Sequence, residues 1–146
     1  MRVAIYHNLG SGGAIRVLEA YLREFHDQHE FELFLPSTAT DEFVSLGKYC
    51  VKVHRIPFPQ AGGKLGPYRH MANLSRLGKD AAARIDAGGF DVALVSASHL
   101  GCSGEVLPFL KTPSLYYAPE HFRAVYDPAP ADAPTPSFKT RVADVV

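Results

Sequence analysis

Short apolar runs alternate along this chain with segments whose apolar residues recur at helical spacing, and this alternation constrains the fold more than any other feature. The runs expected as strands are Val3–Tyr6, Phe31–Leu35, Cys50–Ile56, Asp91–Ser96 and Ser114–Ala118. Helices are predicted over 14–25 and 68–87. Strands that alternate with helices build right-handed β-α-β units around a parallel sheet. We therefore predict an α/β fold, a Rossmann-like doubly wound parallel sheet of five or more strands with helices on both faces.

Weaker patterns give the domain organisation. Short helices are expected over Asp41–Leu46 and Gly104–Leu110. Residues 1–127 read as one Rossmann-like domain, and residues 128–136 as a loop rich in Pro and Ala. The segment from Ser137 onward has the pattern of a further helix of the same domain, without a Gly or Pro stop signal. We expect that the chain is cut inside a helix and that a second domain is missing from it.

Composition excludes several classes of protein. The 146 residues are 47% hydrophobic and 21% charged, which is typical of a globular domain. Lys plus Arg equals Asp plus Glu, so the basic excess of a general nucleic-acid binder is missing. The two cysteines, Cys50 and Cys102, form neither a disulfide framework nor a zinc pattern. No apolar run approaches the roughly 20 residues that span a bilayer. These features favour a cytoplasmic protein, and we predict no metal site.

A glycine turn follows the first predicted strand. Gly10, Gly12 and Gly13 stand directly before the amphipathic helix. Small residues let a ligand approach the backbone, and the N–H groups at a helix start attract anions, phosphate above all. The alternative interpretation is a tight turn that requires glycine for its positive φ. A nicotinamide dinucleotide site is disfavoured, since Ile15 replaces the third glycine of that fingerprint and the second strand ends on Pro36 without an acid.

Histidines follow three of the predicted strands. His7 comes after the first strand, His99 after the fourth and His121 after the fifth. In open parallel sheets, ligands bind beyond the carboxyl ends of the strands. With strand order 3-2-1-4-5, His7 and His99 would flank one crevice and His121 would lie on its rim. The alternative for each is a loop histidine that faces solvent or bonds to the backbone.

Two segments resemble the GT4 group of GT-B glycosyltransferases, in an order and spacing that cover nearly all of the chain. Gly12–Val17 is similar to the "GGAERV" turn and helix of that group, with Ile15 in place of its Glu. The later and more specific segment resembles "YYxHEPxRxxYD"; it comprises Tyr116–Arg123 followed by Tyr126–Asp127, with Pro and His exchanged at 119 and 121. The donor-binding domain of the family, with its E-x7-E motif, is not part of the sequence.

The resemblance implies an acceptor-binding half of a transferase that moves a sugar from a nucleotide diphosphate sugar, with retention and without a metal or resident cofactor. The isolated half is expected to be inactive, because the reaction takes place between two domains. The resemblance implies a glycine turn that faces the donor phosphates. Candidate catalytic residues are His121, Glu120 and His99. Candidate acceptor contacts are His7, Arg69, Arg123 and Asp127, where Arg123 has an alternative partner in Asp127 itself. The acceptor is a sugar, a glycolipid or a related molecule.

A basic segment covers residues 64–87. It holds five Lys and Arg, Arg69 among them, against two Asp. The first interpretation is an ordinary solvated helix surface. The second is a peripheral contact with anionic lipid or a phosphate-bearing acceptor. Two other functions also stay open for the whole chain: a stand-alone phosphate- or nucleotide-binding module, and one subunit of a split transferase whose partner brings the donor half.

Overall fold

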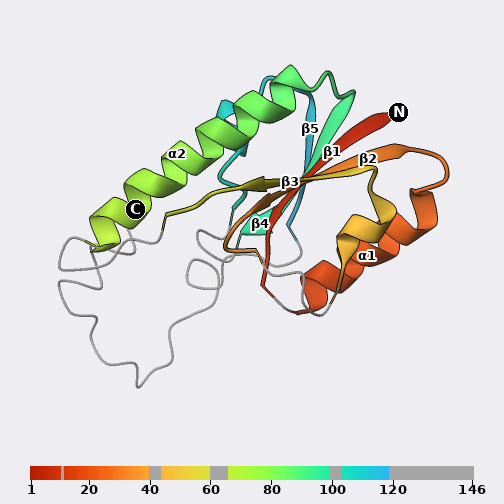
Figure 1. Cartoon of the computed structure of the whole chain (residues 1–146), viewed down its shortest axis with the longest axis horizontal. Helices are drawn as coiled ribbons and strands as arrows, with labels where there is room; N and C mark the ends of the chain where they lie inside the picture. Colours follow the sequence, from red (N-terminus) through yellow and green to blue (C-terminus); the bar gives the residue numbers. More distant parts are fainter. Residues whose placement is uncertain (11, 40–43, 60–65, 99–102, 119–146) are drawn as a thin grey trace, which may run out of the picture.

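The structure is a computed structural model that describes residues 1–10, 12–39, 44–59, 66–98 and 103–118. Five parallel strands form one sheet in the order β3-β2-β1-β4-β5 (Figure 1). Their bounds are Arg2–Asn8 for β1, Glu30–Pro36 for β2, Lys52–Ile56 for β3, Val92–Ser98 for β4 and Ser114–Tyr117 for β5. The predicted α/β class, the number of strands and their order are confirmed.

Two long helices pack on opposite faces of the sheet (Figure 1). Helix α1 (Gly13–Phe25) connects β1 to β2, and helix α2 (Gly66–Ala87) connects β3 to β4. Because these two connections run in opposite directions along the sheet, right-handed crossovers place their helices on opposite faces. The strands are therefore apolar on both sides. Ala4 and Tyr6 pack in the cluster of α2, whereas Val3 and Ile5 pack in the cluster of α1.

The two predicted short helices are 3-10 turns at shifted positions. The turn η1 covers Leu46–Tyr49, where a helix was expected to end at residue 46, and positions 41–43 lie outside the described residues. The turn η2 covers Leu107–Phe109 within the predicted range of 104–110. The chain at Gly104 passes so close to β4 that a Cβ there would lie 2.3 Å from Cγ1 of Val95. Pro108 lacks the N–H that an α-helix over 104–110 would bond to the carbonyl of Gly104, which favours a short turn.

Candidate functional site

The carboxyl edge of the sheet has a topological switch point between β1 and β4. The chain leaves β1 toward α1 on one face, and it enters and leaves β4 through connections on the α2 face. Loops that diverge in this way leave a crevice outside the strand ends, which is where open α/β sheets bind ligands. The predicted strand order placed the site here, and the structure has β1 and β4 as neighbours.

A cluster of polar side chains lies at this point, and we refer to Tyr6, Asn8, Thr38, Ser98 and Glu105 as the switch-point cluster. The carboxylate of Glu105 accepts hydrogen bonds from three donors: the Tyr6 hydroxyl at 3.0 Å, Asn8 Nδ2 at 3.2 Å and the Ser98 hydroxyl. Asn8 Nδ2 also lies 3.3 Å from Ser98 Oγ, and the Thr38 hydroxyl donates to Asn8 Oδ1 at 2.9 Å. The cluster thus joins the ends of β1, β2 and β4.

An irregularity in β4 brings Ser98 into the cluster. Tyr6 is paired with Val95, but two residues later Asn8 is paired with Ser98, so β4 has one more residue than β1 over this stretch. Such a bulge re-aims the side chains beyond it. With a regular register, Ala97 would stand opposite Asn8 and no hydroxyl would reach the amide.

Close backbone packing holds Glu105 in place. A Cβ on Gly78 of α2 would lie 2.1 Å from the main-chain oxygen of Glu105, so helix and turn are in direct contact. Burial and the negative charge of Glu105 both raise the pKa of the Tyr6 phenol. Tyr6 therefore stays protonated and acts as a donor to the carboxylate at any physiological pH.

The glycine turn lies at the same edge, between β1 and α1. Helix α1 starts at Gly13, no side chain caps its first turn, and no acidic residue stands there. A Cβ built on Gly10, Gly12 or Gly13 would meet no described atom within 4 Å. Gly12 has an extended φ of 160°, and among the described glycines only Gly89 has a positive φ. The alternative that glycine is required here for a positive φ is therefore wrong for these three positions, and no described atom crowds them.

His7 is corrected from a crevice residue to a buried one. Its side chain has no exposed surface, and its Nδ1 accepts a hydrogen bond from the main-chain N–H of Leu9 at 3.3 Å. Successive side chains alternate between the two faces of a strand, so His7 lies on the α1 side while Asn8 lies on the α2 side. The ring supports the chain as it enters the glycine turn. A side chain without exposed surface does not contact an acceptor in this conformation.

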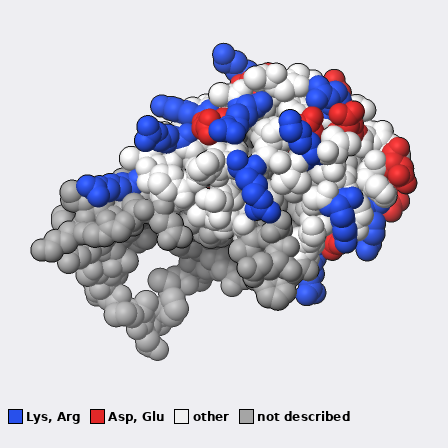
Figure 2. All heavy atoms as spheres, in the orientation of Figure 1, with Lys and Arg blue, Asp and Glu red and all other residues white. Residues whose placement is uncertain are grey.

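The basic segment is a surface of α2, and its apolar stripe belongs to the core. Lys and Arg side chains gather along the part of the surface where α2 lies (Figure 2). Arg69 and Arg76 are exposed, while Arg84 pairs with Asp80 at 3.1 Å. Leu74 and Leu77 of α2 are buried against the sheet. Any contact of these described residues with a membrane would therefore be electrostatic.

The other predicted site residues fall outside the described part of the chain. These are His99, Glu120, His121, Arg123 and Asp127. His99 directly follows Ser98 of the switch-point cluster, and Glu120 follows the end of β5 by three residues. Their assignments stay predictions.

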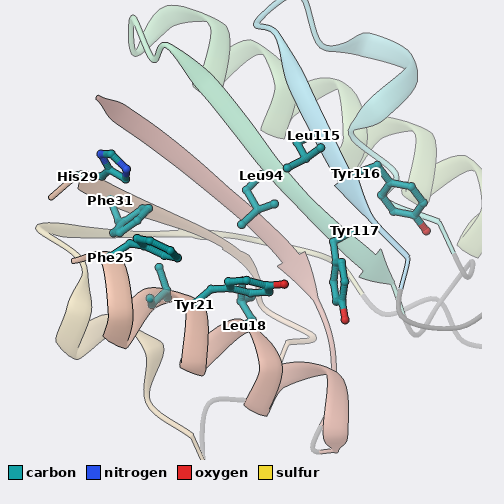
Figure 3. Close-up of a pocket in the computed structure, with 10 residues that line it drawn as sticks. Leu18, Tyr21, Phe25, His29, Phe31, Leu94, Leu115, Tyr116 and Tyr117 are labelled. Carbon is teal, nitrogen blue, oxygen red and sulfur yellow. The ribbon is translucent and has the colours of Figure 1, made fainter. Parts of the chain in front are cut away.

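An apolar groove of about 360 Å³ lies on the α1 face beside β4 and β5 (Figure 3). No described helix covers this part of the sheet, because the connections that lead to β4 and β5 lie on the other face. Tyr21, Phe25 and Leu115 are exposed there. The groove has a lining of aliphatic and aromatic side chains with one histidine, His29, so it lacks the carboxylates and amides that the switch point offers.

Sequence reasoning missed the switch-point cluster. Glu105 was assigned to a short helix, and Asn8, Thr38 and Ser98 were treated as strand or loop residues. The available signal was a polar residue at the end of each apolar strand: Asn8 after Tyr6, Thr38 after Pro36 and Ser98 after Val95. In the part of the chain that the structure describes, no three His, Cys, Asp or Glu residues are arranged to hold a metal ion. No described helix is long and apolar enough to cross a membrane.

Comparison with known proteins identifies a fold and no family. Neither the protein-family models nor the curated proteins match this sequence. A solved structure with a similar fold is the C-terminal domain of a hydrogenase from Pyrococcus furiosus. It superposes with a TM-score of 0.53 at 12% identity, over 80% of this chain and 90% of that one. At this identity the likeness concerns the α/β architecture alone.

Proposed function

We propose that this chain is the acceptor-side half of a two-domain sugar transferase that uses a nucleotide diphosphate sugar. The observation that carries the proposal is the glycine turn. Three glycines stand at the uncapped start of α1, and neither their backbone angles nor any described neighbour requires glycine there. Glycine also permits close approach of a ligand to the backbone, and a diphosphate is the ligand that a helix start without a described side-chain cap would attract.

The proposed chemistry divides between two edges of the crevice. The N–H groups of Gly12 and Gly13 would stabilise the negative charge that develops on the departing nucleotide diphosphate, as preorganised donors do in other transfers. From the resemblance, His121, Glu120 and His99 would orient the acceptor hydroxyl and the transferred sugar, and Arg123 would bind an acceptor phosphate. Transfer requires both substrates to be held together, so the donor-binding half is needed for turnover.

The first experiment tests the glycine turn as a diphosphate site. The isotope-labelled 146-residue chain is titrated with uridine diphosphate, and its amide resonances are followed by NMR. We expect the largest shifts at the amides of Gly10, Gly12 and Gly13. Gly13→Val should abolish them, whereas Ala20→Val should not, since Ala20 is an exposed residue farther along the same helix. Shifts that are absent, or that persist in Gly13→Val, would contradict the proposed site.

The second experiment separates a transferase from a simple binding module. The chain is joined to, or mixed with, a donor-binding half, and transfer from a labelled nucleotide sugar is measured. Under the proposal, His121→Ala and Gly13→Val both lower the rate of transfer while the fold is retained. Diphosphate binding at the glycine turn without transfer in any such combination would favour the stand-alone phosphate-binding module instead.

A further inference from the structure

We propose that Glu105 is a positioning residue for the glycine turn and acts on it through Asn8. The inference rests on the proposed function in one respect, which is that the glycine turn binds a diphosphate. Glu105 lies 97 positions from Asn8 in the sequence, yet its carboxylate is bonded to the last residue of β1. Asn8 stands immediately before the segment that contains Gly10, Gly12 and Gly13.

The hydrogen bonds of Glu105 fix the ends of two strands, β1 and β4. Its carboxylate holds Asn8 at the end of β1 and Ser98 at the end of β4, the strands on either side of the switch point. Asn8 in turn accepts a hydrogen bond from Thr38 beyond β2. The backbone that leaves β1 toward the glycine turn is therefore anchored from both neighbouring strands. Loss of the carboxylate would release that anchor without removing any atom of the turn.

A charged carboxylate fits this position better than its neutral isostere. An ionised carboxylate accepts hydrogen bonds at both oxygens, and Tyr6, Asn8 and Ser98 all present donors to it. Glutamine has the same shape, but one of its two terminal groups is an NH2 donor. With the NH2 toward Asn8, two amide donors face each other, and with the NH2 toward Tyr6, the phenol has to turn from donor to acceptor. Glu105→Gln thus replaces hydrogen bonds to a charged group by weaker neutral ones while it preserves the volume.

A second carboxylate provides a matched control. Asp86 accepts hydrogen bonds from the main-chain N–H and the hydroxyl of Thr112, both at 2.8 Å, and from the N–H of Lys111. It therefore also ties a loop to the body of the domain. Thr112 precedes β5, so this anchor lies at the amino edge of the sheet, opposite the glycine turn. Asp86→Asn should destabilise the chain without any effect on that turn.

The experiment compares Glu105→Gln with Asp86→Asn in the 146-residue chain. Backbone mobility from 15N relaxation and the amide resonances of Gly10, Gly12 and Gly13 are recorded first, because they require no ligand. Pyrophosphate is then titrated. We expect Glu105→Gln to increase the mobility of the glycine turn and to weaken pyrophosphate binding by about tenfold, as for the loss of hydrogen bonds to a charged group. Asp86→Asn should change neither the glycine turn nor the pyrophosphate affinity, when the two variants are compared under conditions in which their free energies of unfolding are equal.

A compensating pair tests the route through Asn8. In the double variant Asn8→Asp with Glu105→Gln, the glutamine amide can donate to the new carboxylate, while Thr38 still donates to position 8. This variant should recover the rigidity of the turn and the pyrophosphate affinity that Glu105→Gln loses. Should Glu105→Gln fail to fold, Ser98→Ala and Tyr6→Phe each remove one donor and should give smaller changes in the same direction.

The outcomes separate this inference from the proposed function. Equal effects of Glu105→Gln and Asp86→Asn on the glycine amides, or no recovery in the double variant, overturn the positioning role. If the wild-type chain does not bind pyrophosphate at the turn, the proposed function fails, and the relaxation measurements alone decide the role of Glu105.

Discussion

Replacement of Gly78 by alanine has two opposite effects on the free energy of unfolding, one from helix propensity and one from tertiary packing. Gly78 lies in the middle of α2, and alanine in a helix interior is favoured over glycine by about 1 kcal/mol. A Cβ at this position would lie 2.1 Å from the carbonyl oxygen of Glu105, 2.8 Å from its carbonyl carbon and 3.1 Å from Cδ2 of Phe109. The first two obstacles are backbone atoms, so rotation of a side chain cannot relieve them.

The packing cost should exceed the propensity gain. Ordinary contact would require α2 and the turn at Glu105 to separate by more than about 1 Å, and insertion of a methyl group into a packed core costs about 1–3 kcal/mol even where side chains can adjust. With a backbone obstacle we take the upper end of that range. Gly78→Ala should then lower the free energy of unfolding by about 2 kcal/mol after the gain in propensity is subtracted.

Urea unfolding followed by circular dichroism provides the measurement. The midpoint of Gly78→Ala should fall at an unchanged slope, since the area exposed on unfolding hardly changes. Ser75→Ala is the control: Ser75 is exposed on the same helix, so the substitution should raise the midpoint slightly through propensity alone. A Gly78→Ala variant as stable as Ser75→Ala, or more stable than the wild type, would refute the claim that α2 and the turn are in direct contact.

Two further predictions concern titratable groups. Hydrogen bonds from His54, at 2.6 Å, and from Arg2 hold the pKa of Glu32 below its usual value of 4.5. Its folded-state pKa is depressed, so its contribution to stability is present above the unfolded pKa and is lost as the pH falls through the folded pKa. Between pH 5 and pH 3, Glu32→Gln should therefore lose less stability than the wild type in urea unfolding, and an equal loss in both would contradict the shift. Burial raises the pKa of the Cys50 thiol to about 11. In a Cys102→Ser background, iodoacetamide at pH 8 should alkylate Cys50 about a hundredfold more slowly in the folded chain than in urea, and equal rates would show that the thiol is not shielded.

Local sequence patterns determined the layers of this protein and the edge at which its crevice lies. Three signals can be read from residues that are close in the sequence. They are the helical period of apolar residues in 14–25, the continuous apolar run before His7 and the glycines that follow it. Once helices alternate with apolar strands, the handedness of β-α-β connections leaves few arrangements. The parallel sheet, its helices on both faces and the glycine turn at the carboxyl edge could therefore be predicted before any coordinates were known.

Only the tertiary structure decided what surrounds that turn. The hydrogen bond between Glu105 and Asn8 joins residues 97 positions apart, and Ser98 stands opposite Asn8 because of an irregularity in the pairing of β1 and β4 that no local pattern announces. His7 and Asn8 are adjacent in sequence but lie on opposite faces, so one is buried under α1 and the other enters the polar cluster. The glycines differ for the same reason: Gly78 is required by a neighbouring backbone, whereas no described atom lies within 4 Å of a Cβ on Gly13. Register and packing between distant segments set these differences, and neither is encoded in the spacing of residues along one strand or helix.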